Sequence, residues 1–197
     1  SKYRGLWGVY GAPYYSLLDA LSRFTFKEGN VTVMINSRFS ARLFRRVYGV
    51  KPIVVYPPVN VELFSKAFHR GERRRVVVTV ARFTREKKLE NAIRLLSLLP
   101  GDVRLVMVGG LTPANRGYFS SLVRLARELG VSDRVVFKPN CPGEELLEIL
   151  GRSSVYLHTM PYEHFGVSIV EAMASGLIPV VHDSGGPREF VPAKYRY

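Results

Sequence analysis

Two glutamates, Glu163 and Glu171, with seven residues between them, give this sequence its strongest chemical signal. They lie in YEHFGVSIVEAMASG, residues 162–176, where most other positions of the predicted helix are apolar. A carboxylate among apolar residues needs hydrogen-bond donors, and two adjacent hydroxyls of a sugar would supply them. The residues alone leave an equally good alternative, in which Glu171 pairs with an arginine and Glu163 simply precedes a helix.

The start of the same helix, near Phe165 and Gly166, offers a second chemical group. Glycine allows a ligand to approach the backbone closely, and the free N–H groups of a first helical turn can hold phosphate oxygens. Glu163 lies in the loop just before this point and follows a predicted strand at residues 155–158. The pattern favours a ligand that carries both hydroxyl and phosphate groups.

A basic loop, VARFTREKK at residues 80–88, follows another apolar strand. The guanidinium of Arg82 and the ammonium of Lys87 are close enough in sequence to reach a single phosphate group. Ligands of open α/β sheets bind beyond the carboxyl ends of the strands, where this loop lies. Taken alone, the loop is better explained as a solvated one. Combined with Glu163 and the helix N-terminus, it predicts a phosphate site.

Short β-branched runs alternate with longer stretches of helical period, and these elements must position the site. Strands are predicted at residues 31–36, 53–56, 76–81, 103–109, 135–138, 155–158 and 178–182. Helices are predicted at residues 14–26, 37–48, 88–99, 117–129, 144–150 and 166–175. Several strands are apolar on both faces, as in a parallel sheet covered by helices on each side. The predicted fold class is α/β, with a Rossmann-like doubly wound parallel sheet.

The order of these elements divides the chain into three parts. Residues 1–50 hold too few strands for a closed sheet and are interpreted as the C-terminal part of one α/β domain. Residues 51–64 are predicted to be an extended connector, because Pro57 and Pro58 in tandem stop a helix. Residues 65–197 are interpreted as most of a second α/β domain that is truncated at its end. We therefore expect a fragment of a longer chain.

Positive charge is concentrated in the first half of the chain. The formal net charge is +13, and residues 1–88 hold 18 Lys and Arg against 5 Asp and Glu, whereas residues 89–197 hold 11 of each. Such an excess indicates nucleic acid, an anionic membrane or a phosphorylated ligand as a partner. Nucleic acid is disfavoured, because the excess lies outside the regular sheet and no recognised nucleic-acid motif occurs.

The helix predicted at residues 37–48 is strongly basic on one side and apolar on the other. This pattern is typical of a helix on an anionic membrane surface, and equally typical of a helix packed on its own domain. Its basic residues are Arg38, Arg42, Arg45 and Arg46. The single cysteine, Cys141, excludes an internal disulfide and a cysteine-based metal cluster, which suits a reducing compartment.

Several motifs together resemble the retaining GT-B glycosyltransferases of family 4. They are the E-x7-E pair, the A-M-A-x-G run that follows it, and a strand leading to SGGP at residues 184–187. Arg82, Lys87 and the connector at residues 56–64 fit the same resemblance, which covers roughly residues 30–191. It implies a GT-B fold in which residues 65–197 are the nucleotide-sugar donor domain and residues before the connector belong to the acceptor domain.

The resemblance also implies a role for each candidate residue. Arg82, Lys87 and Glu163 would be catalytic, since the two cations would neutralise the donor diphosphate and Glu163 would face the donor sugar. Glu171 would hold the ribose hydroxyls. The other donor-binding residues would be His164, Phe165, Gly166, Val167, Lys138 and Pro139. Family enzymes retain the anomeric configuration without a metal or other cofactor, because side chains and a helix N-terminus stabilise the leaving group.

Within that family, four runs are similar to mannosyltransferases that extend dolichol-linked oligosaccharide: MINSRFSARLF, VVYPPVNVELF, VVFKPNCPGEEL and HTMPYEHFGVSIVEAMASG. This similarity implies GDP-mannose as the donor, a polyprenyl-phosphate-linked glycan as the acceptor, and a cytoplasmic enzyme peripheral on the membrane. One alternative is a soluble sucrose- or glycogen-synthase-like transferase that uses UDP- or ADP-sugar. A basic nucleic-acid-binding module is the alternative from another class. The glycine-rich loop of the family's first domain is missing, so we expect nucleotide binding without turnover.

Overall fold

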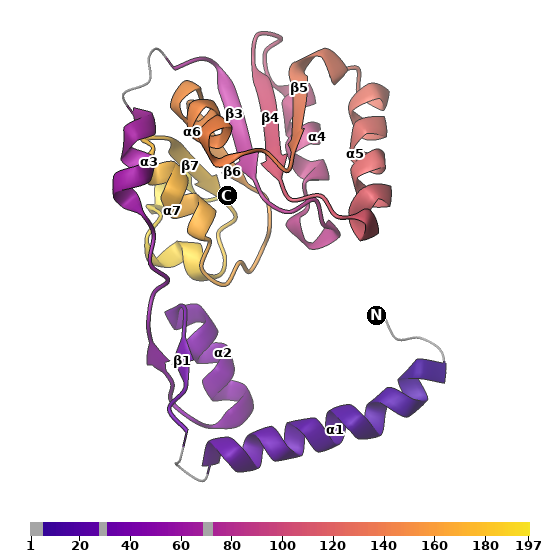
Figure 1. Cartoon of the computed structure of the whole chain (residues 1–197), viewed down its shortest axis with the longest axis vertical. Coiled ribbons are helices and arrows are strands. Elements are labelled where there is room, and N and C mark those ends of the chain that lie inside the picture. The colour runs from indigo at the N-terminus through magenta and orange to yellow at the C-terminus, as the bar shows by residue number, and fades with distance from the viewer. Residues whose placement is uncertain (1–5, 28–30, 69–72) are drawn as a thin grey trace. The chain divides into compact units, whose positions relative to one another are not determined.

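The computed structural model describes residues 6–27, 31–68 and 73–197, which fall into two compact units (Figure 1). Unit 1 is Ser1–Tyr56 and unit 2 is Pro57–Tyr197. The boundary therefore lies at the first of the two tandem prolines. The assignment of the first 50 residues to an acceptor domain stays a prediction.

The described part of unit 1 contains two helices and a two-stranded parallel sheet. Its elements are α1 (Leu6–Lys27), β1 (Met34–Ile35), α2 (Arg38–Tyr48) and β2 (Ile53–Val54). Ser37 caps α2, because its Oγ accepts a hydrogen bond from the N–H of Ser40 at 3.0 Å. Gly49 ends the helix at a φ of 74°. Both strands are shorter than predicted, since each pairs with only one neighbour among the described residues.

Aromatic contacts join the end of α1 to α2. The ring of Phe26 lies edge-on to those of Phe44 and Tyr48, with centroids 5.1 and 5.0 Å apart. Arg23 also donates a hydrogen bond to the carbonyl oxygen of Val47 at 2.6 Å. Even so, α2 contains no fully buried residue.

Unit 2 is built from alternating strands and helices. Its strands are β3 (Val76–Val80), β4 (Arg104–Gly109), β5 (Val135–Pro139), β6 (Val155–His158) and β7 (Ile178–Val181). Its helices are α3 (Val61–Phe68), α4 (Glu90–Leu98), α5 (Arg116–Glu128), α6 (Gly143–Arg152) and α7 (Val167–Ala174). Short 3-10 turns are η1 (Arg85–Lys87), η2 (Pro113–Asn115), η3 (Ser132–Arg134), η4 (Gly186–Glu189) and η5 (Ala193–Tyr195).

The five strands of unit 2 form one parallel sheet in the order β5-β4-β3-β6-β7. The chain moves outward from β3 to β4 and β5, then returns to the other side of β3 for β6 and β7. The strand order thus reverses between β3 and β6, and a crevice forms at the carboxyl ends of two strands whose connections leave in opposite directions. The predicted doubly wound α/β fold is confirmed.

Helices cover both faces of this sheet, as the two-sided apolar strands require (Figure 1). One core lies between the sheet and α4 and α5, and includes Phe83, Ile93 and Leu122. The other lies between the sheet and α3, α6 and α7, and includes Tyr156 and Ile169. The central strands are therefore held on both sides.

Helix α3 corrects one sequence prediction, which placed residues 61–64 in an extended connector. The helix begins directly after Asn60, whose Oδ1 accepts a hydrogen bond from the N–H of Leu63 at 3.0 Å. Phe64 and Ala67 are buried in the core beside α6 and α7. The prolines delay the helix by a few residues, but the burial of its apolar face determines that it forms.

Three consecutive arginines, Arg73, Arg74 and Arg75, precede β3, and the first of them contacts two helices. Its guanidinium donates hydrogen bonds to the carbonyl oxygens of Ser153 and Ser175, at the ends of α6 and α7. Helix ends leave such carbonyls without partners inside the helix. Arg73 therefore joins two helices to the start of the sheet, while Arg75 forms an exposed ion pair with Asp102 at 2.8 Å.

Candidate functional site

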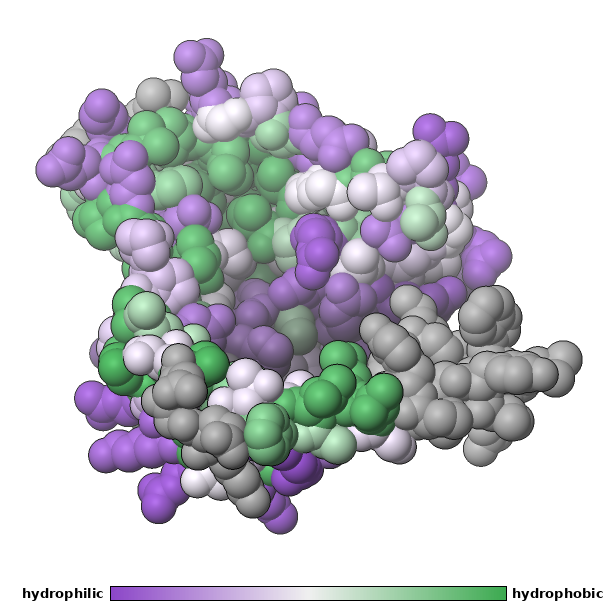
Figure 2. Space-filling model, turned by 60° about the horizontal axis from the view of Figure 1, so that its bottom comes forward, coloured by the Kyte–Doolittle hydropathy of each residue, from purple (hydrophilic) through white to green (hydrophobic). Residues whose placement is uncertain are grey.

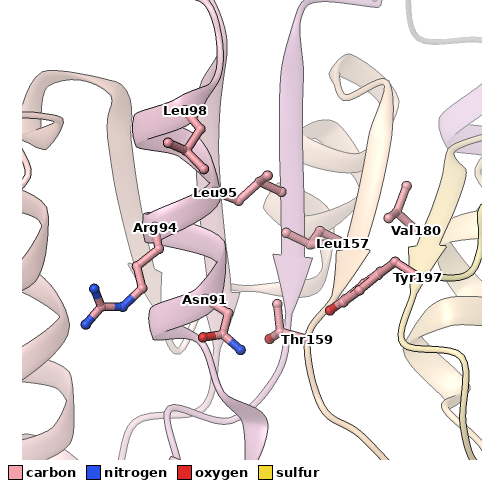
Figure 3. Close-up of a pocket in the computed structure, with 8 residues that line it drawn as sticks. All are labelled: Asn91, Arg94, Leu95, Leu98, Leu157, Thr159, Val180 and Tyr197. Carbon is pink, nitrogen blue, oxygen red and sulfur yellow. The ribbon is translucent and has the colours of Figure 1, made fainter.

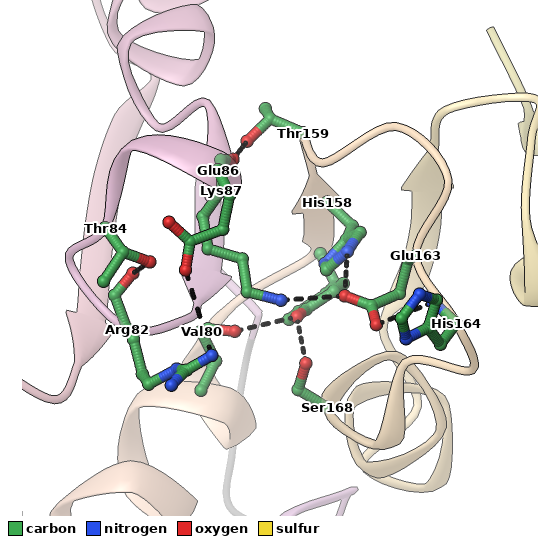
Figure 4. Close-up of polar contacts among 11 residues, drawn as sticks. Val80, Arg82, Thr84, Glu86, Lys87, His158, Thr159, Glu163, His164 and Ser168 are labelled. Atoms are coloured by element: carbon green, nitrogen blue, oxygen red, sulfur yellow. Dashed lines mark hydrogen bonds and ion pairs between the residues drawn. The ribbon is translucent and has the colours of Figure 1, made fainter. Parts of the chain in front are cut away.

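The site lies where the loops after β3 and β6 meet, at the point of strand-order reversal. Lys87 ends η1 after β3, and Glu163 lies in the loop after β6. Their side chains are 76 residues apart in sequence, and the Nζ of Lys87 lies 2.8 Å from the Oε2 of Glu163. Both side chains are mostly buried, at 16% and 14% exposure. The structure thus brings together two residues that the sequence singled out separately (Figure 4).

Glu163 has two further partners. The Nε2 of His158, at the end of β6, lies 3.2 Å from the same Oε2 oxygen. The backbone N–H of His164 donates a hydrogen bond to Oε1 at 3.0 Å. The hydrogen bond from His158 and the charge of Lys87 hold the pKa of Glu163 well below its usual value, so the group is an ionised carboxylate. Because a carboxylate only accepts hydrogen bonds, Nε2 of His158 carries a proton.

The loop that carries Glu163 rests on the SGG segment after β7. The Oγ of Ser184 accepts a hydrogen bond from the N–H of Tyr162 at 2.7 Å, and the N–H of Gly186 donates one to the carbonyl of Glu163 at 2.8 Å. A Cβ at Gly185 would collide with the backbone of Glu163, and one at Gly186 with the backbone of His164. Glycine is required at both positions because the two loops are in direct contact.

Arg82 leaves the same β3 loop as Lys87 but does not reach Glu163. Its side chain is 72% exposed, and its Nη2 lies 3.9 Å from the Oε1 of Glu86 (Figure 4). The backbone of Lys87 is fixed, because the Oγ1 of Thr159 donates a hydrogen bond to its carbonyl oxygen at 2.7 Å. The site thus has one anchored cation in a carboxylate pair and one exposed cation at its edge.

Helix α7 presents its N-terminus next to Glu163. Gly166 caps it at a φ of 94°, where a Cβ would also collide with the side chain of Ile169. No side chain caps this end. The neighbouring predicted residues differ in accessibility, since Phe165 is buried and Val167 is 37% exposed. The helix end fits a ligand that accepts hydrogen bonds from backbone N–H groups.

Glu171, one turn into α7, is half-buried, and burial raises its pKa. Within the described part of the chain, its carboxylate has neither a hydrogen-bond donor nor a cation as a partner. The alternative in which Glu171 pairs with an arginine is therefore not realised there. A half-buried carboxylate without donors is a group that a ligand with hydroxyls would stabilise.

Lys138 and Pro139 end β5, the edge strand on the far side of β4 and β3 from Glu163. The Nζ of Lys138 lies 2.6 Å from the Oε1 of Glu145, and this pairing raises the pKa of the lysine. Asn140 follows, and its side-chain amide bonds both the N–H and the carbonyl of Leu111. Lys138 and Pro139 are thus separated from the Lys87–Glu163 pair, because β5 is the edge strand and two strands away from β3.

A cavity of about 560 Å³ lies elsewhere, on the α4 side of β6 and β7. In Figure 3, Leu95 and Leu157 point into it and Arg94 points away. It is lined mainly by apolar side chains and contains none of the predicted site residues. Thr159 belongs to both features, since it lines the cavity and donates a hydrogen bond to the carbonyl oxygen of Lys87, so the cavity adjoins the site.

Sequence reasoning missed three residues that hold the site: His158, Thr159 and Ser184. The signal for the first two was their position at the carboxyl end of β6, where parallel sheets place ligand-contacting groups. Ser184 lies in the SGGP run that the sequence singled out, but its hydrogen bond with Tyr162 could be found only from the contact between the loops.

No helix in the described ranges has both the length and the apolar character needed to cross a membrane. Those ranges also hold no group of three or more His, Cys, Asp or Glu residues arranged to bind a metal ion. The expectation of metal-independent transfer without a cofactor stays a prediction.

Comparison with known proteins shows the family. The sequence pattern described as "Glycosyl transferases group 1" matches residues 60–196, which include the whole sheet and the Lys87–Glu163 pair. The chain belongs to the glycosyl transferases group 1 family. The match places α3 and everything after it within one family domain.

Named relatives in this family are mannosyltransferases. The GDP-Man:Man(3)GlcNAc(2)-PP-Dol alpha-1,2-mannosyltransferase of Dictyostelium discoideum is 33% identical over 194 residues, which cover 89% of this chain and 38% of that protein. The Neurospora crassa protein of the same name is 39% identical over 155 residues, covering 71% of this chain and 28% of that protein. The chain thus spans well under half the length of these group 1 glycosyltransferases.

A crystal structure of Anabaena HepE in complex with UDP and glucose has the same fold. It matches with a TM-score of 0.71 at 24% sequence identity, over 82% of this chain and 46% of that one. This likeness shows the fold, and with it the GT-B type of the group 1 family.

Proposed function

We propose that this chain is the donor-binding part of a retaining mannosyltransferase that transfers mannose from GDP-mannose to a lipid-linked glycan. The observation that carries the proposal is the Lys87–Glu163 pair at the strand-order reversal, next to the open N-terminus of α7. The names of the relatives, which contain GDP-mannose and a dolichol-linked glycan, support the choice of substrates. The activity belongs to the longer protein, and the chain alone is expected to bind nucleotide without turnover.

In this proposal the leaving group is a nucleoside diphosphate, and cations stabilise the charge that develops on it. Lys87 and Arg82 both lie in the loop after β3, so their ammonium and guanidinium groups can approach a diphosphate from the same side. The N–H groups of Val167 and Ser168, which begin α7, approach it from the other side, whereas the N–H of Ile169 already bonds the carbonyl of Gly166. Transfer of this kind needs no metal.

The two glutamates take different hydroxyl groups. Glu163, ionised and fixed on three sides, faces the hydroxyls of mannose together with His164 and the backbone at Phe165 and Gly166. Since both of its oxygens are held by protein groups, we assign it no nucleophilic role. Glu171, which has no partner among the described residues, accepts hydrogen bonds from the ribose hydroxyls.

The nucleobase lies at the end of β5 in this proposal, beside Lys138 and Pro139. The Lys138–Glu145 ion pair and the Asn140–Leu111 hydrogen bonds hold this strand end in shape. Because these side chains already have partners in the protein, we infer that backbone groups recognise the base. The side-chain types at this strand end therefore do not distinguish guanine from uracil.

Calorimetric titration of the chain with GDP, UDP, ADP and duplex DNA tests the proposal. We expect GDP to bind more tightly than UDP or ADP, and DNA to bind weakly. Preference for UDP or ADP would favour the sucrose- or glycogen-synthase-like alternative. DNA binding that falls steeply with salt, without affinity for any nucleotide, would overturn the proposal in favour of a nucleic-acid-binding module.

We also propose that unit 1 contacts the anionic cytosolic face of a membrane through α2. Leu43 and Val47 are each 45% exposed. They share α2 with Arg42, Arg45 and Arg46, and no acidic residue occurs in this helix. Figure 2 shows hydrophobic and hydrophilic residues intermixed on one face of the molecule. Flotation with vesicles of phosphatidylcholine, with and without phosphatidylserine, tests this: equal recovery would show that α2 only packs within its own domain.

A further inference from the structure

One oxygen of Glu163 is shared by two groups, one on a long flexible side chain and one on a short, rigid ring. Oε2 lies 2.8 Å from the Nζ of Lys87 and 3.2 Å from the Nε2 of His158. Lys87 reaches it through a four-carbon side chain from a three-residue 3-10 turn. A lysine ammonium is a mobile point charge, which can follow a ligand without movement of the backbone.

His158, in contrast, is fixed by the core of unit 2. Its side chain is only 4% exposed, and its ring lies nearly parallel to that of Tyr156, at an angle of 15° and a centroid distance of 6.3 Å. The hydroxyl of Tyr156 in turn bonds the carbonyl of Val80 at 3.2 Å and the Oγ of Ser168 at 2.7 Å. The imidazole is thus tied to β6 and, through its neighbour, to β3 and α7.

We propose that His158 is a positioning residue, which keeps the Glu163 carboxylate facing the donor sugar when Lys87 turns to the diphosphate. This inference rests on the proposed function, in which Lys87 binds the diphosphate and Glu163 the sugar. Once the ammonium moves, the remaining donors to the carboxylate are Nε2 of His158 and the N–H of His164, one to each oxygen. Without His158, Oε2 loses its fixed donor, and the carboxylate turns away from the sugar hydroxyls.

Two substitutions of similar polarity separate this role from mere core packing. In His158→Gln, the amide nitrogen stands near the place of Nε2 and can still donate to Glu163. In His158→Asn, the shorter amide stops near the place of Nδ1 and cannot. The control ligand is GDP, which has no sugar beyond the ribose and so does not require Glu163.

The experiment measures the dissociation constants of GDP-mannose and GDP for the 197-residue chain and its variants by calorimetry. We expect His158→Asn to weaken GDP-mannose relative to GDP by roughly tenfold, the scale of one hydrogen bond to a charged group, with GDP changed less than twofold. His158→Gln should restore the wild-type ratio. An unchanged ratio in His158→Asn, with GDP still bound, overturns the inference and leaves the proposed function intact. Failure of the wild type to bind GDP overturns the proposed function itself.

A measurement on the wild-type chain covers the case in which a variant does not fold. In a histidine nitrogen–proton spectrum, the Nε2 proton of His158 should remain bonded and protected when GDP-mannose is added. Loss of that proton signal on addition of GDP-mannose, but not of GDP, would overturn the inference.

Discussion

At the scale of single residues, Lys87 and Glu163 form an ion pair, which a ligand that binds Lys87 would have to break. The two side chains are mostly buried and lie 2.8 Å apart, so each compensates the other in the unliganded chain. In the proposed function, a bound diphosphate would compete with Glu163 for the ammonium of Lys87. The two members of this pair should therefore respond to substitution in opposite directions.

Removing a cation should weaken nucleotide binding. We expect Lys87→Ala and Arg82→Ala each to cost about 1.5–3 kcal/mol of GDP binding, because each loses a charged hydrogen bond to phosphate. Titration calorimetry measures this, with Arg124→Ala as a charge-matched control, since Arg124 forms an exposed ion pair with Glu128 on α5. Unchanged GDP affinity in both variants would remove the two residues from the site.

Neutralising the anion should instead strengthen the binding of GDP. In Glu163→Gln the ammonium of Lys87 loses its carboxylate partner and is free for the diphosphate, so GDP should bind more tightly by up to about 1 kcal/mol. GDP-mannose should not share this gain, because its sugar loses a charged acceptor. The same calorimetric titrations apply, and weaker binding of GDP to Glu163→Gln would contradict the competition.

At the scale of elements, α7 carries both the N-terminus that is proposed to face the ligand and the half-buried carboxylate of Glu171. Burial raises the pKa of Glu171 above its ordinary value of 4.5, so the folded chain binds this proton more readily than the unfolded chain. A raised pKa gives stability that is present below the unfolded pKa and lost as the pH rises through the folded one. The charged form therefore destabilises the unliganded chain at neutral pH.

Glu171→Gln should accordingly stabilise the chain at pH 7 while weakening nucleoside binding, since the ribose loses a charged acceptor. The gain in free energy of unfolding should vanish below pH 4, where the wild-type carboxyl is protonated in both states. Urea unfolding at pH 7 and pH 3.5 measures the first effect, and comparison of GDP with its 2′-deoxy analogue measures the second. Equal affinity of the wild type for the two nucleotides would show that Glu171 does not hold the ribose.

The loop contacts beneath Glu163 give another element-scale prediction. Gly186→Ala should lower the free energy of unfolding by about 1–3 kcal/mol, because the added methyl group meets the backbone of His164. Gly143→Ala is the matched control: a Cβ there meets nothing within 4 Å, so its effect should be small. Urea unfolding compares the two, and equal stability would show that the SGG segment can move away from the loop without cost.

These elements also show what sequence could and could not predict. The spacing of apolar residues predicted the strands of unit 2 and all of its helices except α3. It thereby also placed the basic loop and the two glutamates at the ends of these elements. It could not predict that Lys87 and Glu163 touch, because strand order brings together loops 76 residues apart. Helix α3 was missed since tandem prolines hid a helix stabilised by burial of Phe64 and Ala67. His158 was missed although it ends β6, because a histidine at a strand end fits a buried core residue as well as a ligand contact.

At the scale of the whole molecule, unit 1 has the higher net charge per residue, whereas the candidate site belongs to unit 2. Residues 1–56 hold nine Lys and Arg against two Asp and Glu, a net charge of +7, and residues 57–197 hold 20 against 14, a net charge of +6. Every candidate site residue lies in unit 2. The sheet, its two cores and both loops of the site are formed within residues 57–197. Nucleotide binding and membrane binding should therefore be separable functions of this chain.

A shortened chain of residues 57–197 tests that separation. We expect it to bind GDP within about twofold of the full chain, a difference of about 0.4 kcal/mol, because all the residues proposed to meet the nucleotide lie in it. The same shortened chain should lose the added recovery with phosphatidylserine vesicles, since Arg42, Arg45 and Arg46 of α2 are gone.

The matched control is the full chain with these three arginines changed to glutamine, which should behave like the shortened chain on vesicles and like the wild type with GDP. If the shortened chain folds but loses GDP affinity while the glutamine variant keeps it, unit 1 contributes to the nucleotide site by contacts other than charge, and the division of function between the units is wrong.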